Sequence, residues 1–259
     1  MCCRYYVEPT PYFVELGELA QKTTNNSRLK INEGQVMFAG EISPGNVVPV
    51  LASNKAGKKI AFLMFWGMHA KDGKLVINAR SETAAEKQMF SESWAEHRCI
   101  IPASWYYEWA HRNLPDGNTF DGFSYSKRQG KPYSKQPGGS SLTARSYSPL
   151  SGGAGAGQKY YLQPAGSDKT FLCGIYRMEN KFPYFAVLTR DSSPDIAFIH
   201  DRMPLIMPED LADDWIDPKK DPKELAKHAL TEMVFEKVIK DDPQLRLNFD
   251  EKGNRSFSA

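Results

Sequence analysis

Many short apolar segments, separated by Gly, Pro and Asn, most strongly limit the fold of this chain. They are rich in Val, Ile, Phe and Leu, which favour strands. The predicted strands are 35–39, 47–51, 59–66, 75–77, the long aromatic run 98–111, 159–163, 170–178 and 184–189. Strands and helices do not alternate regularly, so a doubly wound parallel sheet is disfavoured. We predict an α+β fold with a mainly antiparallel mixed sheet or open barrel and flanking helices.

Helices are predicted where apolar residues recur at helical spacing. The first is 11–24, and the second is 83–96, where Thr83 and Glu86 could form a capping box. Three further helices are predicted at 194–199, 208–216 and 221–230. These helices would flank the sheet.

One stretch in the middle of the chain differs from the rest. Residues 112–158 are rich in Gly, Ser, Pro, Asn and Gln, and their charges from Ser124 to Tyr160 are all basic. We predict a single domain over 1–240 with a flexible basic insertion at about 112–158, followed by a polar tail at 241–259. The alternative for the insertion is a solvated loop without a function.

Composition narrows the functional classes. The net charge of +2 does not indicate a general nucleic-acid binder, so a basic surface would have to be local. The four cysteines contain no C-x-x-C pair, so neither a zinc site nor another metal site is expected. No cofactor-binding motif, signal peptide or membrane-length apolar stretch is visible. We expect a cytoplasmic protein without a cofactor, for which a monomer would suffice.

Cysteine is the second residue of the chain. Removal of Met1 would give Cys2 a free α-amine beside its thiol, and both groups of such an aminothiol titrate close to neutral pH. The pair could attack an electrophile twice. The alternative is that Cys2 has no role.

Three other polar residues are candidates for catalysis because their neighbours are apolar. Asn78 follows a strand and could orient a substrate oxygen or serve as a turn residue. Glu108 lies among four aromatic residues, which would raise its pKa toward neutrality unless it lies on an exposed strand face. His200 lies between an apolar segment and an Arg-Met-Pro turn, where it could equally be structural.

Several residues near these candidates could contact nucleic acid. Arg4, Arg80 and Arg202 each lie beside one of them and could bind phosphate, or could be ordinary surface or salt-bridge residues. The segment Trp66–Met68 closes an apolar strand and could stack on bases or insert between them, or Trp66 could belong to the core.

The order and spacing of these segments resemble the SOS-response-associated peptidase (SRAP) family, whose members are abasic-site DNA–protein crosslinkers. The resemblance rests on Cys2–Tyr5, Phe65–Gly67, Asn78–Thr83, Cys99–Ala103, Tyr107–Trp109, Leu188–Thr189 and Ile199–Pro204. It runs from Cys2 to about Trp215, with the insertion outside it. One departure is Cys3, where the family usually has Gly.

The resemblance implies a role for each candidate. Cys2 would be the nucleophile, with Asn78, Glu108 and His200 as its active-site partners. DNA contacts would come from Arg4, Pro44, Trp66, Gly67, Met68, Arg80, Trp109 and Arg202. The implied substrate is single-stranded DNA with an abasic site, trapped as a thiazolidine, with weak AP-lyase and autoproteolytic activity. Association with the nucleoid at damaged DNA would follow, and a replication partner stays unidentified.

Two other functions remain open. Cys2, His200 and Asn78 could form a cysteine-type peptidase or amidohydrolase. The aromatic residues and the basic insertion could also make a non-catalytic module that binds single-stranded DNA.

Overall fold

The computed structural model describes residues 2–26, 34–54, 56–110 and 157–238. Its helices are α1 (Pro11–Asn26), α2 (Ser81–Ala84), α3 (Ser91–Glu96), the 3-10 helix η1 (Glu209–Leu211), α4 (Ala212–Ile216) and α5 (Pro222–Ala226). The strands in the first half are β1 (Arg4–Val7), β2 (Gln35–Val36), β3 (Gly40–Ile42), β4 (Asn46–Ser53), β5 (Lys59–Trp66), β6 (Met68–His69), β7 (Leu75–Val76), β8 (Asn78–Arg80), β9 (Arg98–Ala103) and β10 (Trp105–Trp109). Those in the second half are β11 (Lys159–Pro164), β12 (Thr170–Glu179), β13 (Phe182–Asp191), β14 (Arg202–Pro204), β15 (Ile206–Met207) and β16 (Met233–Lys237).

The larger sheet is a mixed, mainly antiparallel barrel. Its strands run in the order β14-β13-β5-β4-β9-β12-β15, and an additional pairing of β12 with β13 closes the path from β13 through β5, β4 and β9 to β12 into a ring. Among the described strands, only β13 with β5, β13 with β8, and β2 with β4 pair in parallel. The predicted fold class is therefore confirmed, with a closed path at the centre of the sheet.

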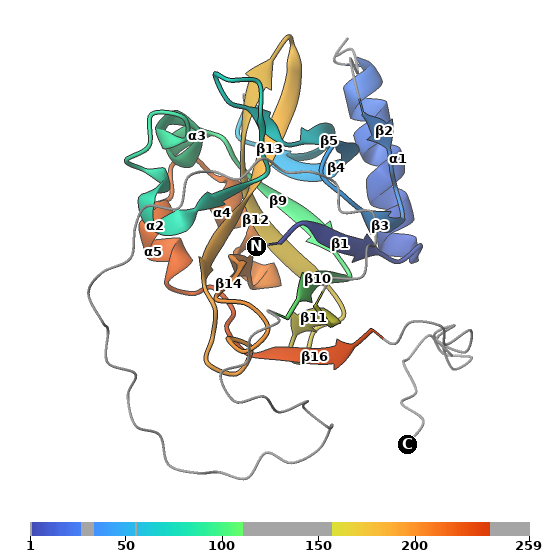
Figure 1. Ribbon diagram of the computed structural model, residues 1–259. Coiled ribbons are helices and arrows are strands. Elements are labelled where there is room, and N and C mark those ends of the chain that lie inside the picture. The colour runs from blue at the N-terminus through green and yellow to red at the C-terminus, as the bar shows by residue number, and fades with distance from the viewer. Residues whose placement is uncertain (1, 27–33, 55, 111–156, 239–259) are drawn as a thin grey trace.

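A second sheet carries the start of the chain. Its strand order is β16-β11-β10-β1-β3, so β1 is an inner strand held between β10 and β3. Figure 1 shows α1 along one side of the molecule, the short helices α2 to α5 on the other, and β16 at the end of the second sheet. The two sheets share one apolar core, which includes Tyr5 of β1 and Trp66 of β5, whose ring centroids are 5.3 Å apart.

The predicted elements agree best where their apolar pattern is long. Helix 11–24 and strand 59–66 are confirmed as α1 and β5. The prediction of one helix over 83–96 is wrong, because two short helices, α2 and α3, flank a non-helical stretch. The capping box is also wrong, since Thr83 lies inside α2 and no side chain caps its start.

One further predicted helix and one predicted strand differ from the structure. Residues 194–199 form turns and not a helix, and the run 98–111 is divided into β9 and β10 around Ser104. The insertion at about 112–158 lies almost wholly outside the described residues, and so does the tail 241–259. Among the helices that the structure describes, none combines the length and apolar character needed to cross a bilayer.

Candidate active site

The amino-terminal segment begins at a buried position. Cys2 has no exposed surface and lies just before β1. Asn78 begins β8, and its Nδ2 donates a hydrogen bond of 2.8 Å to the backbone oxygen of Cys2. The Oδ1 of Asn78 is buried and has no hydrogen-bond partner among the described residues. Asn78 thus fixes Cys2 and keeps one acceptor for another donor, which goes beyond a turn residue.

The thiol of Cys2 is held in its protonated form. Burial raises its pKa well above the usual value, and the charge of Glu108 raises it further. The thiol also lies 3.7 Å from the backbone oxygen of Arg4, toward which it can donate a weak hydrogen bond. The thiol of Cys2 thus differs here from a solvated thiol that titrates near neutral pH, and a base would have to remove its proton before attack.

Glu108 has the properties of that base. It lies on β10, is only 3% exposed, and burial raises the pKa of its carboxyl to about 7. The raised pKa confirms the sequence-based expectation. A carboxyl with this pKa can both accept and release a proton at neutral pH.

His200 faces the same small cavity as Glu108. The lining residues are Tyr106, Glu108, Leu162, Ser192, Ile196, Ile199, His200 and Arg202. The backbone N–H of Arg202 donates to Nδ1 of His200 at 2.9 Å, which places the proton of the neutral ring on Nε2. The carboxylate of Asp201 also lies 2.8 Å from this Nδ1. His200 can therefore donate a proton or a hydrogen bond through Nε2.

Arg202 is occupied by protein carboxylates. Its guanidinium donates to both carboxylate oxygens of Glu82 at 2.8 Å, to Asp191 at 2.5 Å and to the backbone oxygen of Thr189 at 2.8 Å. The arginine is only 9% exposed. The structure thus gives Arg202 an internal ion pair, and a DNA phosphate would have to compete with it.

The other two arginines are more accessible. Arg80 is exposed at the end of β8, next to Ala79 and two residues from Asn78. Arg4 is partly buried, and its Nε lies 3.2 Å from Glu41. Lys159 also binds Glu41, at 2.8 Å, so three charged side chains meet at this end of β1.

The segment Trp66–Met68 lies in the core. Trp66 and Met68 have no exposed surface, and the indole N–H of Trp66 donates to the backbone oxygen of Ile77 at 3.0 Å. Gly67 has a φ of 126°, and a Cβ there would lie 3.2 Å from the side chain of Leu75. The predicted stacking surface is absent from this described segment, because β5 is covered by neighbouring elements at this point. Trp66 is the core residue that the sequence allowed as the alternative.

The two remaining predicted DNA contacts lie at the edges of the site. Pro44 is partly buried in the turn after β3, and the next residue, Gly45, donates its N–H to the backbone oxygen of Trp66 at 2.9 Å. Trp109 ends β10 and is partly buried, with the ammonium of Lys159 5.4 Å from its ring centre. The site thus extends from the end of β5 to the end of β10.

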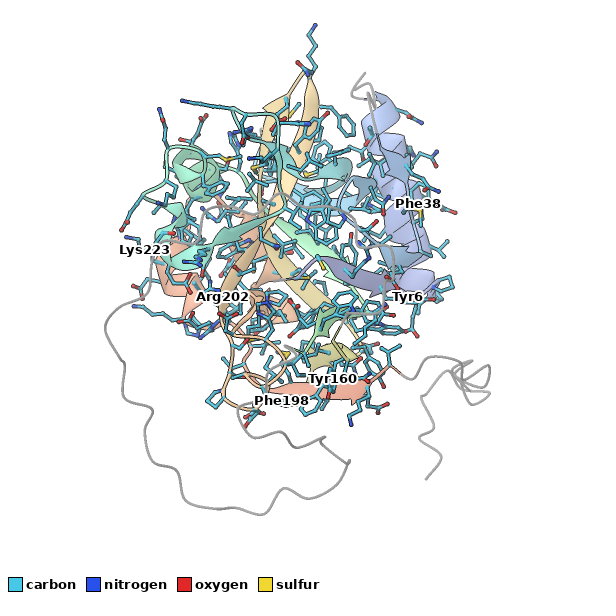
Figure 2. The ribbon with its side chains drawn as sticks, in the orientation of Figure 1. Tyr6, Phe38, Tyr160, Phe198, Arg202 and Lys223 are labelled. Atoms are coloured by element: carbon cyan, nitrogen blue, oxygen red, sulfur yellow. The ribbon has the colours of Figure 1, made fainter. Side chains whose placement is uncertain are left out.

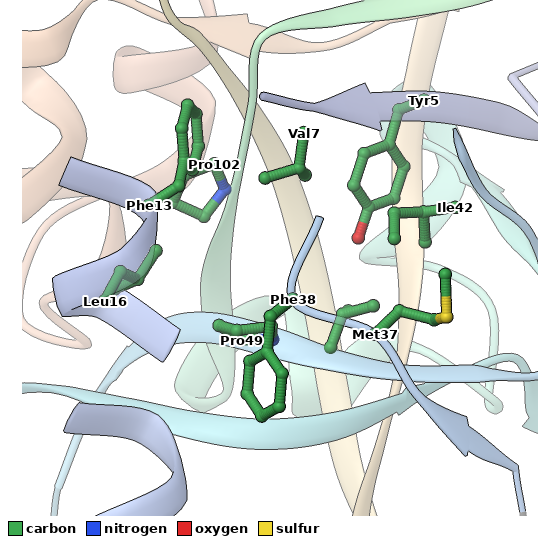
Figure 3. Close-up of a pocket in the computed structure, with 10 residues that line it drawn as sticks. Tyr5, Val7, Phe13, Leu16, Met37, Phe38, Ile42, Pro49 and Pro102 are labelled. Atoms are coloured by element: carbon green, nitrogen blue, oxygen red, sulfur yellow. The ribbon is translucent and has the colours of Figure 1, made fainter. Parts of the chain in front are cut away.

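A different cavity lies between α1 and the sheets and has no catalytic character. Figure 3 shows its apolar lining, which consists of Tyr5, Val7, Phe13, Leu16, Met37, Phe38, Ile42, Val48, Pro49 and Pro102. Among the described residues, no group of three or more His, Cys, Asp or Glu side chains could hold a metal ion.

The match to a protein family agrees with this geometry. The family model described as SOS response associated peptidase (SRAP) matches residues 1–134 and 147–241. The chain belongs to the SRAP family. The match includes every catalytic candidate and leaves out only 135–146 and the end of the chain.

This SRAP member is also similar to individual relatives and to solved structures. It is 27% identical over 192 residues to the abasic site processing protein YoqW of Bacillus subtilis, covering 72% of this chain and 70% of that protein. It is 26% identical over 218 residues to the abasic site processing protein HMCES of Xenopus tropicalis, covering 76% and 59%. A solved protein from Bacteroides thetaiotaomicron has the same fold, with a TM-score of 0.57 and 17% identity over 93% of both chains. A phage-related protein from Bordetella bronchiseptica gives a TM-score of 0.58 at 19% identity, covering 92% of this chain and 94% of that one.

Sequence reasoning missed several partners in the site. Glu82 and Asp191 bind Arg202, and Lys159 lies 3.7 Å from the ring centre of Tyr107. Glu82 stands within the N-A-R-S-E-T segment, and this motif could have indicated it as the partner of a buried arginine. The other contacts join residues far apart in the chain, for which one sequence carries no signal.

Proposed function

We propose that this protein captures abasic sites in single-stranded DNA by forming a thiazolidine with Cys2. One observation carries the proposal: a buried Cys2, fixed by Asn78 at 2.8 Å, lies within the electrostatic reach of Glu108, whose pKa is about 7. The abasic sugar supplies an aldehyde, and the proposed function requires hydrolytic removal of Met1. The relatives named as abasic site processing proteins support this substrate.

The reaction proceeds in two steps. The α-amine of Cys2 adds to the C1′ aldehyde and expels water, which leaves an imine. The thiol then adds across the C=N bond: sulfur bonds to carbon and a proton goes to nitrogen. The balance is aldehyde plus aminothiol to thiazolidine plus one water.

Each partner has a task in these steps. Glu108 takes the thiol proton and returns it to nitrogen, because its pKa allows both at neutral pH. The unpaired Oδ1 of Asn78 can accept from the α-amine or from a sugar hydroxyl. His200 donates through Nε2 to the sugar oxygen as the ring opens.

DNA contacts would come from the accessible charges at the rim of the site. Arg80 is exposed, and Arg4 is partly so, and guanidinium groups bind phosphate oxygens through paired hydrogen bonds. Single strands suit the site because a lesion in a duplex would first have to be unstacked. The imine also permits β-elimination, so we expect weak AP-lyase activity.

The test uses a uracil-containing oligonucleotide treated with uracil glycosylase. We expect a heat-stable adduct whose mass equals protein without Met1 plus DNA minus one water. Cys2→Ala should abolish it, because the thiazolidine needs the sulfur. Cys2→Ala and Cys2→Ser both keep the α-amine and should give only an imine, detectable after borohydride reduction.

Cys3→Ala is the matched control, since it removes the adjacent thiol and should leave the adduct intact. If wild-type protein lacking Met1 gave no adduct, the proposal would be wrong. If Cys2→Ala still gave the heat-stable adduct without borohydride, a nucleophile other than the thiol of Cys2 would be responsible. Steady cleavage of a peptide substrate that depends on Cys2, without DNA capture, would instead support a peptidase.

A further inference from the structure

The loop that carries His200 is closed on itself and packed inward. It spans residues 192–201 between β13 and β14, and the N–H of Ser192 donates to the backbone oxygen of Asp201 at 3.0 Å. Ile196 and Ile199 are 2% and 1% exposed and line the cavity that contains Glu108. Two side chains of the loop therefore form part of the wall next to the catalytic carboxyl.

A third side chain of the loop joins an aromatic cluster. Phe198 lies 5.3 Å from Phe235 and 6.0 Å from Tyr160, measured between ring centres. Tyr160 and Phe235 are 6.1 Å apart. All three pairs are edge-to-face, with interplanar angles of 65° to 89°. Figure 2 shows Tyr160 and Phe198 next to each other beside β16.

Each ring of the cluster is coupled to the site by its position in the chain. Tyr160 of β11 is the cross-strand partner of Glu108. Phe198 precedes His200 by two residues, and Phe235 of β16 is the partner of Leu162, which lines the cavity. The cluster therefore connects the strand neighbour of Glu108 to the loop of His200.

Resting on the proposed function, we propose that Tyr160, Phe198 and Phe235 form an aromatic clamp that holds His200 beside Glu108 and seals this end of the cavity from water. The three are positioning residues, because they act through His200 and Glu108. Phe235 is 36% exposed, so it forms the outer, solvent-facing part of the clamp. Its ring can be removed without deleting a fully buried side chain.

The test compares Phe235→Ala with Val234→Ala. Val234 is the adjacent residue of β16, is 45% exposed and points to the opposite face of the strand, so it is a matched control. We expect Phe235→Ala to slow adduct formation about tenfold at saturating DNA, since small misplacements of reacting groups cost this much or more. DNA affinity should not change, and Phe235→Tyr, which keeps the ring, should restore the rate.

A second readout separates positioning from general destabilisation. Water admitted by Phe235→Ala would lower the pKa of Glu108, whose value is raised mainly by burial. The corresponding inflection near pH 7 in the pH–rate profile should move to lower pH. Val234→Ala should leave the inflection in place. The other titratable and charged groups around this carboxyl are the α-amine of the chain, Cys2, Cys3, Tyr106, His200, Asp201 and Arg202.

A measurement without DNA distinguishes failure of the clamp from failure of the proposed function. NMR titration of the Glu108 carboxyl, assigned with Glu108→Gln, should give a lower pKa in Phe235→Ala than in wild type. An unchanged titration together with an unchanged rate would overturn the clamp. A wild type that forms no adduct, but whose Glu108 pKa falls in Phe235→Ala, would refute the reaction and support the clamp.

Discussion

Glu108 and three of its four aromatic neighbours in the sequence occupy opposite faces of β10. Side chains alternate along a strand, so Trp105, Tyr107 and Trp109 point away from the side of Glu108. Its burial comes instead from Tyr106 two residues earlier, its cross-strand partner Tyr160, and the loop of His200. The raised pKa of the carboxyl is therefore a product of the folded chain and not of the local sequence.

The raised pKa makes stability depend on pH. Glu108 has a pKa of about 7 in the fold against 4.5 when solvated, so the folded state binds more protons between these values. Stability contributed by this group is present below pH 4.5 and lost as pH rises through 7. The loss amounts to about 3 kcal/mol.

Replacement of Glu108 by glutamine should therefore stabilise the protein at pH 8, because the amide cannot ionise. At pH 5 the variant and the wild type should differ little. Urea unfolding at both pH values measures this difference. Equal stability differences at pH 5 and pH 8 would show that the carboxyl is not buried in solution.

At the residue scale, the sequence was sufficient where a residue's own segment determines its surroundings. The raised pKa of Glu108 was predicted, but from four aromatic neighbours of which three lie on the other face of β10. The protonated thiol of Cys2 was not predicted, because its burial depends on β8 and β10, which are distant in the sequence. The core position of Trp66 was an open alternative that only packing could decide.

At the scale of elements, the two ion pairs of Arg202 join three segments around the site. Arg202 begins β14, Glu82 lies in α2, and Asp191 ends β13. Burial opposes ionisation of Glu82, but hydrogen bonds from Arg202 outweigh it and lower the pKa of the carboxyl. Since α2 follows directly on β8, this pair also fixes the strand that begins with Asn78.

Removing each carboxylate partner of Arg202 should have unequal effects. Glu82→Gln should cost about 1 kcal/mol, because Arg202 is only 9% exposed and loses a bidentate partner, while the 44% exposure of the Glu82 side chain weakens the pair. Asp191→Asn should cost less than about 0.5 kcal/mol, because the side chain of Asp191 is 88% exposed. Denaturant unfolding at pH 7 gives both values. Equal costs would contradict the greater importance of Glu82, which is the more buried of the two carboxylates.

The sequence predicted long elements better than short ones. The apolar pattern determined α1 and β5, because each spans enough residues for its period to be read. Strands β14, β15 and β16 were missed, since two or three paired residues, or an exposed strand such as β16, leave no periodic pattern. Residues 194–199 have helical spacing but form turns, and from these turns Ile196 and Ile199 line the cavity.

At the scale of the whole molecule, the amino-terminal strand is central and not peripheral. β1 hydrogen-bonds to β10 on one side and to β3 on the other, and Cys2 is buried where it begins. The proposed nucleophile is therefore held by a sheet whose other strands, β3, β10, β11 and β16, are spread along the sequence. The inner position of β1 thus restricts the motion of Cys2.

Extra residues at the two ends of the chain should consequently have opposite effects. Any residue left before Cys2 blocks its α-amine as an amide, so thiazolidine formation should be lost. The same peptide added after Ala259 should leave the reaction unchanged. Intact mass spectrometry of both proteins after incubation with abasic DNA measures the result. Crosslinking by the amino-terminally extended protein, with the extension still attached, would refute the proposed chemistry.

Binding to DNA should depend on a few charges and not on the overall balance. Arg80 is exposed near the site, while the chain as a whole carries only +2. Arg80→Ala should weaken binding of every single-stranded sequence and lower the slope of log affinity against log salt by about 1. Fluorescence anisotropy at several salt concentrations tests this, with Lys181→Ala as a control, because the exposed Lys181 lies in the turn before β13, at the other end of that strand from Thr189, the partner of Arg80. An unchanged slope would mean that Arg80 does not contact phosphate.

The inner position of β1 also determines how a captured strand could be released. DNA joined to Cys2 would be anchored to a segment that cannot leave while β3 and β10 remain paired with it. Small nucleophiles from solvent would not reach the bond at the buried Cys2. A force on the DNA would act on all the strands that are paired with β1. Such a link should persist for the lifetime of the folded protein, and its removal would await digestion of the polypeptide itself.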